Sequence, residues 1–337
     1  MRVAGGGSLT REEAQCAMGT IMAGEATPAQ IGALLAALHV RGETVEEITG
    51  FASSLRSAAV AVVLDTDGAI DTCGTGGDRS RTFNISTVAA IVAAAAGARV
   101  AKHGNRAASS ACGSADVLEA LGIRIDLGPE GVAACIREAG IGFMFAPRFH
   151  PAMRHAAPVR GEIGIRTVFN VLGPLANPAG IRSQLLGVPS VSLGETMAAV
   201  LRDLGAERAL VVHGGDGLDE ITTSGETLTW ELRDGAIRPG SIDPRSFGVP
   251  EAPRDALVGG DAKANAAIAK RVLEGVTGAP RSAVLLNAGA ACYVAGLAGT
   301  VREGVDLAAR TIDSGAARER LDRFAAASEH AAGRVIA

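Results

Sequence analysis

The sequence predicts an α/β protein, with a small N-terminal helical domain and a larger α/β domain around a mostly parallel central sheet. Within residues 1–60, three amphipathic patterns of helical period each follow a capping motif. From about residue 69, short apolar segments alternate with helical ones, the pattern of βα units. We therefore expect a helical domain over residues 1–66, joined by a helical segment near 151–167, and an α/β domain over residues 67–337.

Each N-terminal helix is predicted to begin at a threonine. Thr10, Thr27 and Thr44 are each followed three positions later by Glu or Gln, which forms a capping box. Gly24 and Gly42 stand where the first two helices should end. Three such helices cannot bury all their apolar faces alone, so we expect this unit to pack on the rest of the chain or on a partner.

The remaining elements follow from apolar segments and helical periodicity. Five segments are predicted to be buried strands: 69–73, 99–102, 142–146, 209–213 and 283–286. Five are predicted to be helices: 87–96, 114–121, 129–139, 193–204 and 263–274. Residues 228–232 alternate polar and apolar, which favours an antiparallel edge strand. Loops at the carboxyl ends of the parallel strands should form the site.

Composition excludes several classes of protein. With 47% hydrophobic and 20% charged residues, the chain is globular, and its net charge of −4 does not suggest a nucleic-acid partner. Its five cysteines are scattered without a CxxC pair, so a disulfide framework or zinc site is not expected. The longest apolar run, 88–96, is far short of the roughly 20 residues of a membrane span. With no visible signal peptide, we expect a cytoplasmic protein without a membrane partner.

The first candidate binding segment is a glycine-rich loop after the first predicted strand. Residues 71–78 are Asp-Thr-Cys-Gly-Thr-Gly-Gly-Asp, and Asn-Ile-Ser-Thr at 84–87 leads into a helix. The glycines expose backbone N–H groups and the helix N-terminus favours an anion. An ordinary βα turn with a Ser/Thr cap would show the same pattern. Both common nucleotide motifs are absent, since Arg79 breaks G-x-G-x-x-G and no G-K-[ST] follows.

A second loop of the same kind follows the next predicted strand. Residues 102–106 are Lys-His-Gly-Asn-Arg, and Ser109, Ser110 and Ser114 come soon after. Two cations, an amide and three hydroxyls suit a phosphate-rich ligand, although a solvated basic loop is the plainer alternative. Two such loops in succession on one sheet edge indicate a single ligand with at least two phosphates.

A third segment, at the end of another predicted strand, is acidic. Residues 213–220 are His-Gly-Gly-Asp-Gly-Leu-Asp-Glu. The adjacent carboxylates of Asp219 and Glu220 suit a hard cation shared with phosphates, and Asp216 lies near them in sequence. By itself the segment could equally be an acidic surface turn.

The fourth segment, 145–167, carries His150, His155, Arg160 and Arg166. Arginine is a natural partner for a carboxylate substrate, whereas a pair of histidines five positions apart is a poor metal clamp. The alternative is ordinary surface charge on a helix.

In this order, G-T-G-G-D, N-I-S-T, K-H-G-N-R, H-P-A-M and D-G-L-D-E resemble the anthranilate phosphoribosyltransferase family over nearly the whole chain. The resemblance implies a site between a helical and an α/β domain, and a homodimer formed through the helical domain. It implies transfer of the phosphoribosyl group of 5-phosphoribosyl 1-pyrophosphate (PRPP) to the amino group of anthranilate, with Mg²⁺, in tryptophan biosynthesis. The products are N-(5-phosphoribosyl)anthranilate and pyrophosphate. A pyrimidine nucleoside phosphorylase-like pentosyltransferase is the alternative. A second alternative is a non-enzymatic relative that binds nucleic acid. Such a protein should lose the acceptor residues and gain a basic face, whereas this chain keeps Asn105 and Arg160 and has a net charge of −4.

The resemblance also implies roles for individual residues. For PRPP these are Gly74, Gly77, Asp78, Thr82, Asn84, Ile85, Ser86, Thr87, Lys102, His103, Gly104, Asn105, Arg106, Ala107, Ala108, Ser109, Ser110 and Ser114. For anthranilate they are Gly74, Asn105, Arg160 and His150, with Arg160 on the carboxylate and with His103 and His150 lining the acceptor tunnel. For Mg²⁺ they are Ser86, Asp219 and Glu220. No acid, base or nucleophile is assigned, because ionisation of the donor and a weakly basic aryl amine do not obviously require one. Cys73 and Cys112 have no predicted role.

Overall fold

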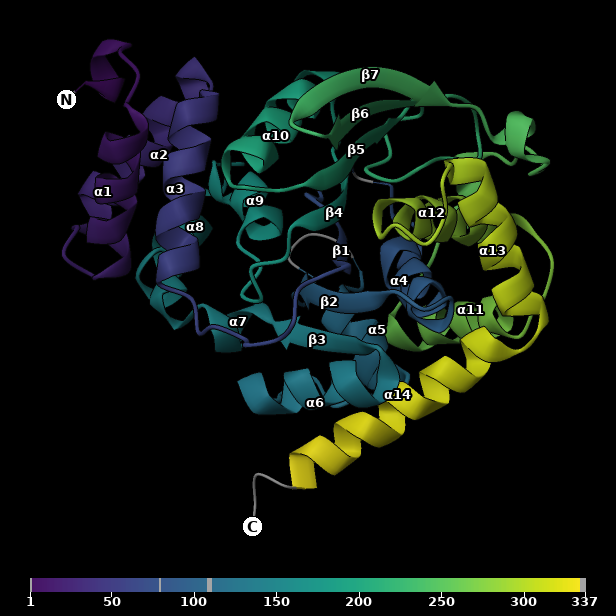
Figure 1. Cartoon of the computed structure of the whole chain (residues 1–337). Coiled ribbons are helices and arrows are strands. Elements are labelled where there is room, and N and C mark those ends of the chain that lie inside the picture. Colours follow the sequence, from purple (N-terminus) through teal and green to yellow (C-terminus); the bar gives the residue numbers. More distant parts are fainter. Residues whose placement is uncertain (1, 79, 108–110, 334–337) are drawn as a thin grey trace.

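The computed structural model describes residues 2–78, 80–107 and 111–333, and Figure 1 shows its architecture. The N-terminal unit contains α1 (Arg11–Met22), α2 (Pro28–Arg41) and α3 (Val45–Ser57), with the short α8 (Ala157–Ile163) against α2. All three capping boxes are present, in the pairs Thr10–Glu13, Thr27–Gln30 and Thr44–Glu47. In each pair the threonine oxygen accepts from the backbone N–H three residues later, whose side chain accepts from the threonine N–H. The predicted N-terminal helices are therefore confirmed.

The rest of the chain is built on a seven-stranded sheet of order β3-β2-β1-β4-β5-β6-β7. Its strands are β1 (Ala69–Gly74), β2 (Arg99–Gly104), β3 (Ile141–Phe145), β4 (Ser183–Gly187), β5 (Arg208–Gly214), β6 (Thr227–Arg233) and β7 (Ala236–Ile242). The first five pair in parallel, while β6 and β7 are antiparallel. The expected helical domain and mostly parallel sheet are confirmed.

Helices cover both faces of the sheet (Figure 1). The helices of this larger unit, besides α8, are α4 (Ile85–Ala95), α5 (Ser114–Ala120), α6 (Pro129–Ala139), α7 (Ala146–Phe149), α9 (Phe169–Leu172), α10 (Val191–Asp203), α11 (Ala262–Leu273), α12 (Ala279–Val294), α13 (Val301–Asp313) and α14 (Ala316–Gly333). Of these, α11, α13 and α14 pack mainly on other helices. On β4, Leu185 packs into the core shared with α4 and α12, while Leu186 packs into the core shared with α10 and the N-terminal helices. This alternation is the period of a strand buried on both faces.

Two strand predictions are corrected. The segment 283–286, predicted as a strand, lies inside α12, which is buried on nearly every side. A short apolar run cannot distinguish a strand from a fully buried helix, because neither shows a polar face. The segment 228–232 is antiparallel as predicted, but it is not the edge, since β7 pairs along its outer side.

The N-terminal helices share a core with the larger unit. Leu35 and Phe51 belong to the same buried cluster as Val159, Leu186 and Val211. The helical unit therefore packs on the rest of the chain, as its size required. The boundary at residue 66 stays a prediction. Among the described residues, no helix combines the length and apolarity needed to cross a membrane.

Candidate active site

The parallel strands end beside one another in the order β2, β1, β4, β5, and the candidate segments follow them. Gly74 at the end of β1 pairs with Gly187 at the end of β4, and Thr75 N donates to Gly187 O at 3.0 Å. The glycine loop, the 102–107 segment and the acidic segment therefore leave the same sheet edge, as predicted.

Asp219 packs against the paired glycines. A Cβ on Gly74 would lie 2.2 Å from Asp219 Oδ2, and one on Gly187 would lie 1.6 Å from Asp219 O. Glycine is therefore required at both positions by close approach, because any side chain would displace Asp219.

The two adjacent carboxylates hold different elements. Gly76 N donates to Asp219 Oδ2 at 2.7 Å, and Ser86 N donates to Glu220 Oε1 at 3.1 Å. Asp219 thus faces the glycine loop, while Glu220 faces the first turn of α4. The three residues predicted as metal ligands, Ser86, Asp219 and Glu220, are brought together.

The two buried carboxylates of this cluster favour the uptake of positive charge, as a proton or as a cation. Burial, with the charge of nearby Asp78, raises the pKa of Asp219, and burial with the charge of Asp219 raises that of Glu220. Within the described residues, no group of three or more His, Cys, Asp or Glu side chains is arranged to hold a metal alone. A cation here would need further oxygens from the Ser86 hydroxyl, water or substrate phosphates, which is the usual coordination of Mg²⁺.

Lys102 is buried on β2, where its charge acts on the cluster. Its Nζ donates to Thr72 O, and its charge opposes the rise in the pKa of both Glu220 and Asp71. Asp71, wholly buried, accepts from His103 N at 3.3 Å and from Asn177 Nδ2 at 2.9 Å. Lys102 is thus not part of a solvated basic loop.

Arg106 points elsewhere. Its guanidinium pairs with Asp116 at 2.8 Å and Glu119 at 2.5 Å, and lies 5.5 Å above the Phe145 ring centroid. A role at pyrophosphate would require it to leave both carboxylates.

The remaining residues expected at PRPP form the walls of the two loops. Asn84 Nδ2 donates to Cys112 O at 3.1 Å, which ties the start of α4 to the second loop. Ser114 Oγ donates to Asn105 O at 3.3 Å, and a Cβ on Gly104 would lie 2.2 Å from Ser114 Oγ. Thr82 Oγ1 lies 3.1 Å from Ser80 Oγ, and Ala107 N donates to Asp116 Oδ2. Ile85 and Thr87 are buried in α4. Ala108, Ser109 and Ser110 lie outside the described residues.

The residues expected at anthranilate include a buried histidine pair. The rings of His103 and His150 have centroids 5.0 Å apart, and His103 Nδ1 lies 3.2 Å from Gly173 O. Neither Nε2 has a hydrogen-bond partner among the described residues. Burial, with the neighbouring His150, lowers the pKa of His103 to about 3, and burial lowers that of His150. Both rings are therefore neutral near pH 7.

Arg160, on α8, is half-buried and lies 5.0 Å above the Phe169 ring centroid. Burial lowers its pKa, and no carboxylate pairs with it among the described residues. Its guanidinium is thus free to receive a carboxylate.

Two contacts were not predicted. Arg166 Nη2 donates to Gly76 O at 3.1 Å, so Arg166 reaches the glycine loop. Asn287 in α12 accepts from Ile221 N and donates to Ile221 O, which anchors the residue after Glu220. A lone amide within an alanine-rich helix was the available signal for Asn287, because a buried amide needs partners.

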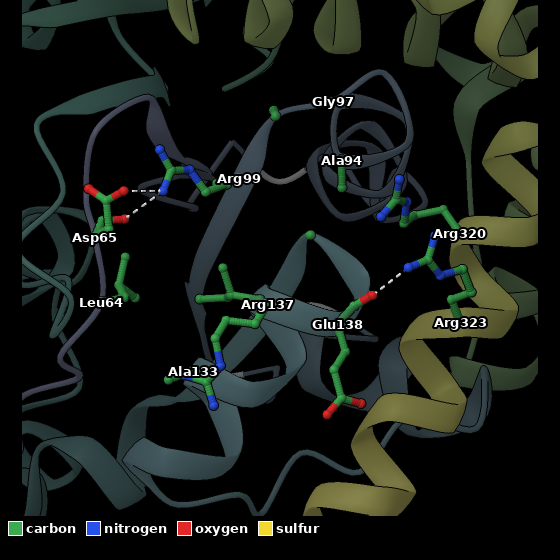
Figure 2. A pocket seen from close by; sticks show the side chains of 13 residues that line it. Leu64, Asp65, Ala94, Gly97, Arg99, Ala133, Arg137, Glu138, Arg320 and Arg323 are labelled. Atoms are coloured by element: carbon green, nitrogen blue, oxygen red, sulfur yellow. Dashed lines mark hydrogen bonds and ion pairs between the residues drawn. The ribbon is translucent and has the colours of Figure 1, made fainter.

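A cavity of about 520 Å³ lies at the other end of the parallel strands, near the amino ends of β2 and β3 (Figure 2). Arg320 and Arg323 in it donate to Ala139 O and Glu138 O at the carboxyl end of α6. It contains none of the predicted site residues, and these two arginines cap a helix.

Comparisons with known proteins agree with this geometry. Residues 66–318 match the family described as "Glycosyl transferase family, a/b domain", and residues 1–59 match its "helical bundle domain". The chain is 56% identical to anthranilate phosphoribosyltransferase of Herpetosiphon aurantiacus over 95% of both chains. It is also 56% identical to that of Rubrobacter xylanophilus, over 99% of this chain and 97% of the relative.

Solved structures show the same likeness. The crystal structure of anthranilate phosphoribosyltransferase from Thermus thermophilus matches with a TM-score of 0.93 and 47% identity, over 97% of this chain and 98% of that one. The Saccharomyces cerevisiae enzyme in complex with PRPP and Mg matches with a TM-score of 0.88 and 28% identity, over 96% and 94%. The chain belongs to the anthranilate phosphoribosyltransferase family.

Proposed function

We propose that this chain transfers the phosphoribosyl group of PRPP to the amino group of anthranilate, in tryptophan biosynthesis, with Mg²⁺ as cofactor. The observation that carries the proposal is the Asp219–Glu220 pair, held between a glycine loop and a helix N-terminus in a chain of this family. The relatives do not favour the nucleoside phosphorylase-like alternative.

The donor site is proposed from the loops at the sheet edge. Backbone N–H groups of the glycine loop and of the first turn of α4 suit the phosphates. Ser86, Asp219 and Glu220 would hold the cation, which fits their like charges and the raised pKa values of both carboxylates. When bound, Mg²⁺ supplies positive charge to the departing pyrophosphate. The Saccharomyces cerevisiae complex with PRPP and Mg supports this assignment.

In the reaction, the C1′–O bond to pyrophosphate breaks and its electron pair leaves with pyrophosphate. The nitrogen lone pair of anthranilate forms the new C1′–N bond, and that nitrogen then loses a proton. Buried Lys102 contributes positive charge near the leaving group. The protein otherwise acts by holding the two substrates in line.

The acceptor site is proposed to lie toward α8, with Arg160 on the carboxylate of anthranilate. The neutral rings of His103 and His150 suit an aromatic acceptor, and their unpartnered Nε2 atoms are available to it or to water. Gly74 and Asn105 would lie between acceptor and donor. The Saccharomyces cerevisiae complex with 4-fluoroanthranilate supports an aromatic amine in this family's site.

The activity is tested by mixing the protein with anthranilate, PRPP and Mg²⁺ and following anthranilate fluorescence. We expect fluorescence to fall, and to stop falling when PRPP is omitted or EDTA is added. Constant fluorescence at high protein concentration would refute the proposal. Phosphate-dependent release of the base from uridine, without use of anthranilate, would instead establish the alternative.

We further propose a cytoplasmic homodimer formed through the N-terminal helices. Val40 on α2 is 85% exposed, which suits an apolar contact with a second copy. None of the five cysteines forms a disulfide within the described part of the chain, which suits a reducing compartment. Light scattering should give twice the chain mass of 33.9 kDa, and a mass of one chain would contradict the dimer.

A further inference from the structure

Arg166 lies in the short segment between α8 and α9 and reaches over the glycine loop. Its Nη2 donates to Gly76 O at 3.1 Å. A Cβ added to Gly77 would lie 1.3 Å from Arg166 Nη1 and 2.3 Å from its Cζ. The guanidinium therefore rests against Gly77 where any other residue would place a side chain.

Gly76 is also held through its other peptide group. Gly76 N donates to Asp219 Oδ2 at 2.7 Å while Gly76 O accepts from Arg166. The loop thus lies between a cation from one segment and a carboxylate from another. No carboxylate pairs with Arg166 among the described residues, so its charge is not neutralised by a neighbour.

The loop needs such external contacts. Gly76 and Gly77 have φ values of +70° and +90°, two successive residues in the left-handed region. Glycines lose more conformational freedom than other residues on ordering, and they have no side chains with which to anchor themselves. A fixed conformation here therefore depends on partners such as Arg166 and Asp219.

We propose that Arg166 is a positioning residue that holds the Gly76–Gly77 turn in the conformation that binds the pyrophosphate of PRPP. This inference rests on the proposed function and deepens it. Arg160 lies on α8, six positions before Arg166, so Arg166 also connects the proposed acceptor side of the site to the donor loop.

The test compares Arg166→Ala and Arg166→Lys with Arg154→Ala as a matched control. Arg154 is an exposed arginine in the short 3-10 helix (Pro151–His155) before α8, without a hydrogen bond or ion pair among the described residues. Hydrogen exchange of a peptide covering residues 74–83 measures loop order in the free protein. Calorimetry measures binding of PRPP with Mg²⁺, and steady-state kinetics separate KM from kcat.

For Arg166→Ala we expect faster exchange in that peptide, unchanged exchange in α1–α3, and binding of PRPP about tenfold weaker, the usual effect of losing one charge-assisted hydrogen bond. KM for PRPP should rise more than kcat falls. Lysine should restore part of the loss, because it can donate to Gly76 O but cannot also cover Gly77. The control should match the wild type.

Wild-type exchange and wild-type affinity for PRPP in Arg166→Ala would overturn the inference. So would an equal loss in Arg154→Ala, since that would indicate a general charge effect. Failure of the proposed function is separate: a chain that binds PRPP through an Arg166-dependent loop yet never consumes anthranilate would refute the acceptor and not the loop role.

Discussion

Replacing Gly74 with alanine tests whether the position of Asp219 controls use of the metal. Gly74 does not adopt a positive φ, so the backbone itself tolerates alanine. The three atoms nearest to the added Cβ all belong to Asp219: Oδ2 at 2.2 Å, Cγ at 2.7 Å and the backbone O at 3.2 Å. The effect should therefore act through Asp219, and mainly through its carboxylate.

The size of the effect follows from the displacement. Real Cβ contacts are essentially never under 3.0 Å, so the carboxylate must move by about 1 Å. A shift of that size along the hydrogen bond from Gly76 N would lengthen it from 2.7 Å to about 3.7 Å, beyond bonding distance. Misplacement by about 1 Å in a site that acts by positioning costs about 100-fold in rate, or about 2.7 kcal/mol in activation free energy.

The assay is a Mg²⁺ titration of the fall in anthranilate fluorescence at fixed PRPP. We expect Gly74→Ala to need more Mg²⁺ for half-maximal rate and to reach a maximal rate about 100-fold lower. Gly161→Ala is the control, because its Cβ would meet nothing within 4 Å and alanine favours its helix. A folded Gly74→Ala protein with an unaltered titration would refute the reasoning. A rise confined to KM for anthranilate would show that Gly74 acts on the acceptor instead.

Two further outcomes are expected. Arg160→Ala should raise KM for anthranilate about tenfold or more and leave KM for PRPP nearly unchanged, because it removes an unpaired cation from the acceptor side. Steady-state kinetics measure both constants. A rise in KM for PRPP alone would exclude the proposed contact of Arg160 with the carboxylate of anthranilate. His103, whose pKa is lowered to about 3 by burial and by His150, should make the protein less stable as pH falls below about 6.5, because the unfolded chain takes up the proton first. The free energy of unfolding should fall by about 1.4 kcal/mol per pH unit from pH 6.5 down toward pH 3. Urea unfolding at pH 7.5 and 5.5 measures this fall, which should be smaller in His103→Gln than in the wild type. An equal fall in both proteins would mean that His103 does not titrate on unfolding.

Elements with local signals could be predicted from the sequence. The capping boxes at Thr10, Thr27 and Thr44 each depend on two residues three positions apart, so they can be recognised without knowledge of the tertiary structure. The strand β4 was not predicted, because Ser183–Gly187 is short and carries polar Ser183 and Gln184 in a fully buried position. Its buried polar side chains are accounted for only by contacts that the fold brings, such as Gln184 Nε2 to Pro174 O at 2.8 Å.

In the site, too, the local features could be predicted and the contacts between segments could not. Contiguous motifs indicated which segments would carry charge and exposed N–H groups, and the strand order brought them to one edge. The contacts between segments were not predictable, because they depend on register across strands. Neither the approach of Asp219 to Gly187 nor the reach of Arg166 to Gly76 leaves a pattern in the sequence of either segment.

This difference changes how the glycines of the site are understood. The sequence suggests that they let the loop turn, and the positive φ of Gly76 and Gly77 supports this for those two. Gly74 and Gly187 have no such need, and each instead leaves room for Asp219. Gly77 has both reasons, since Arg166 occupies the place of its side chain. Substitution separates the two causes: removing Arg166 should relieve the steric part of a Gly77→Ala defect, whereas nothing but moving Asp219 can relieve that of Gly74→Ala.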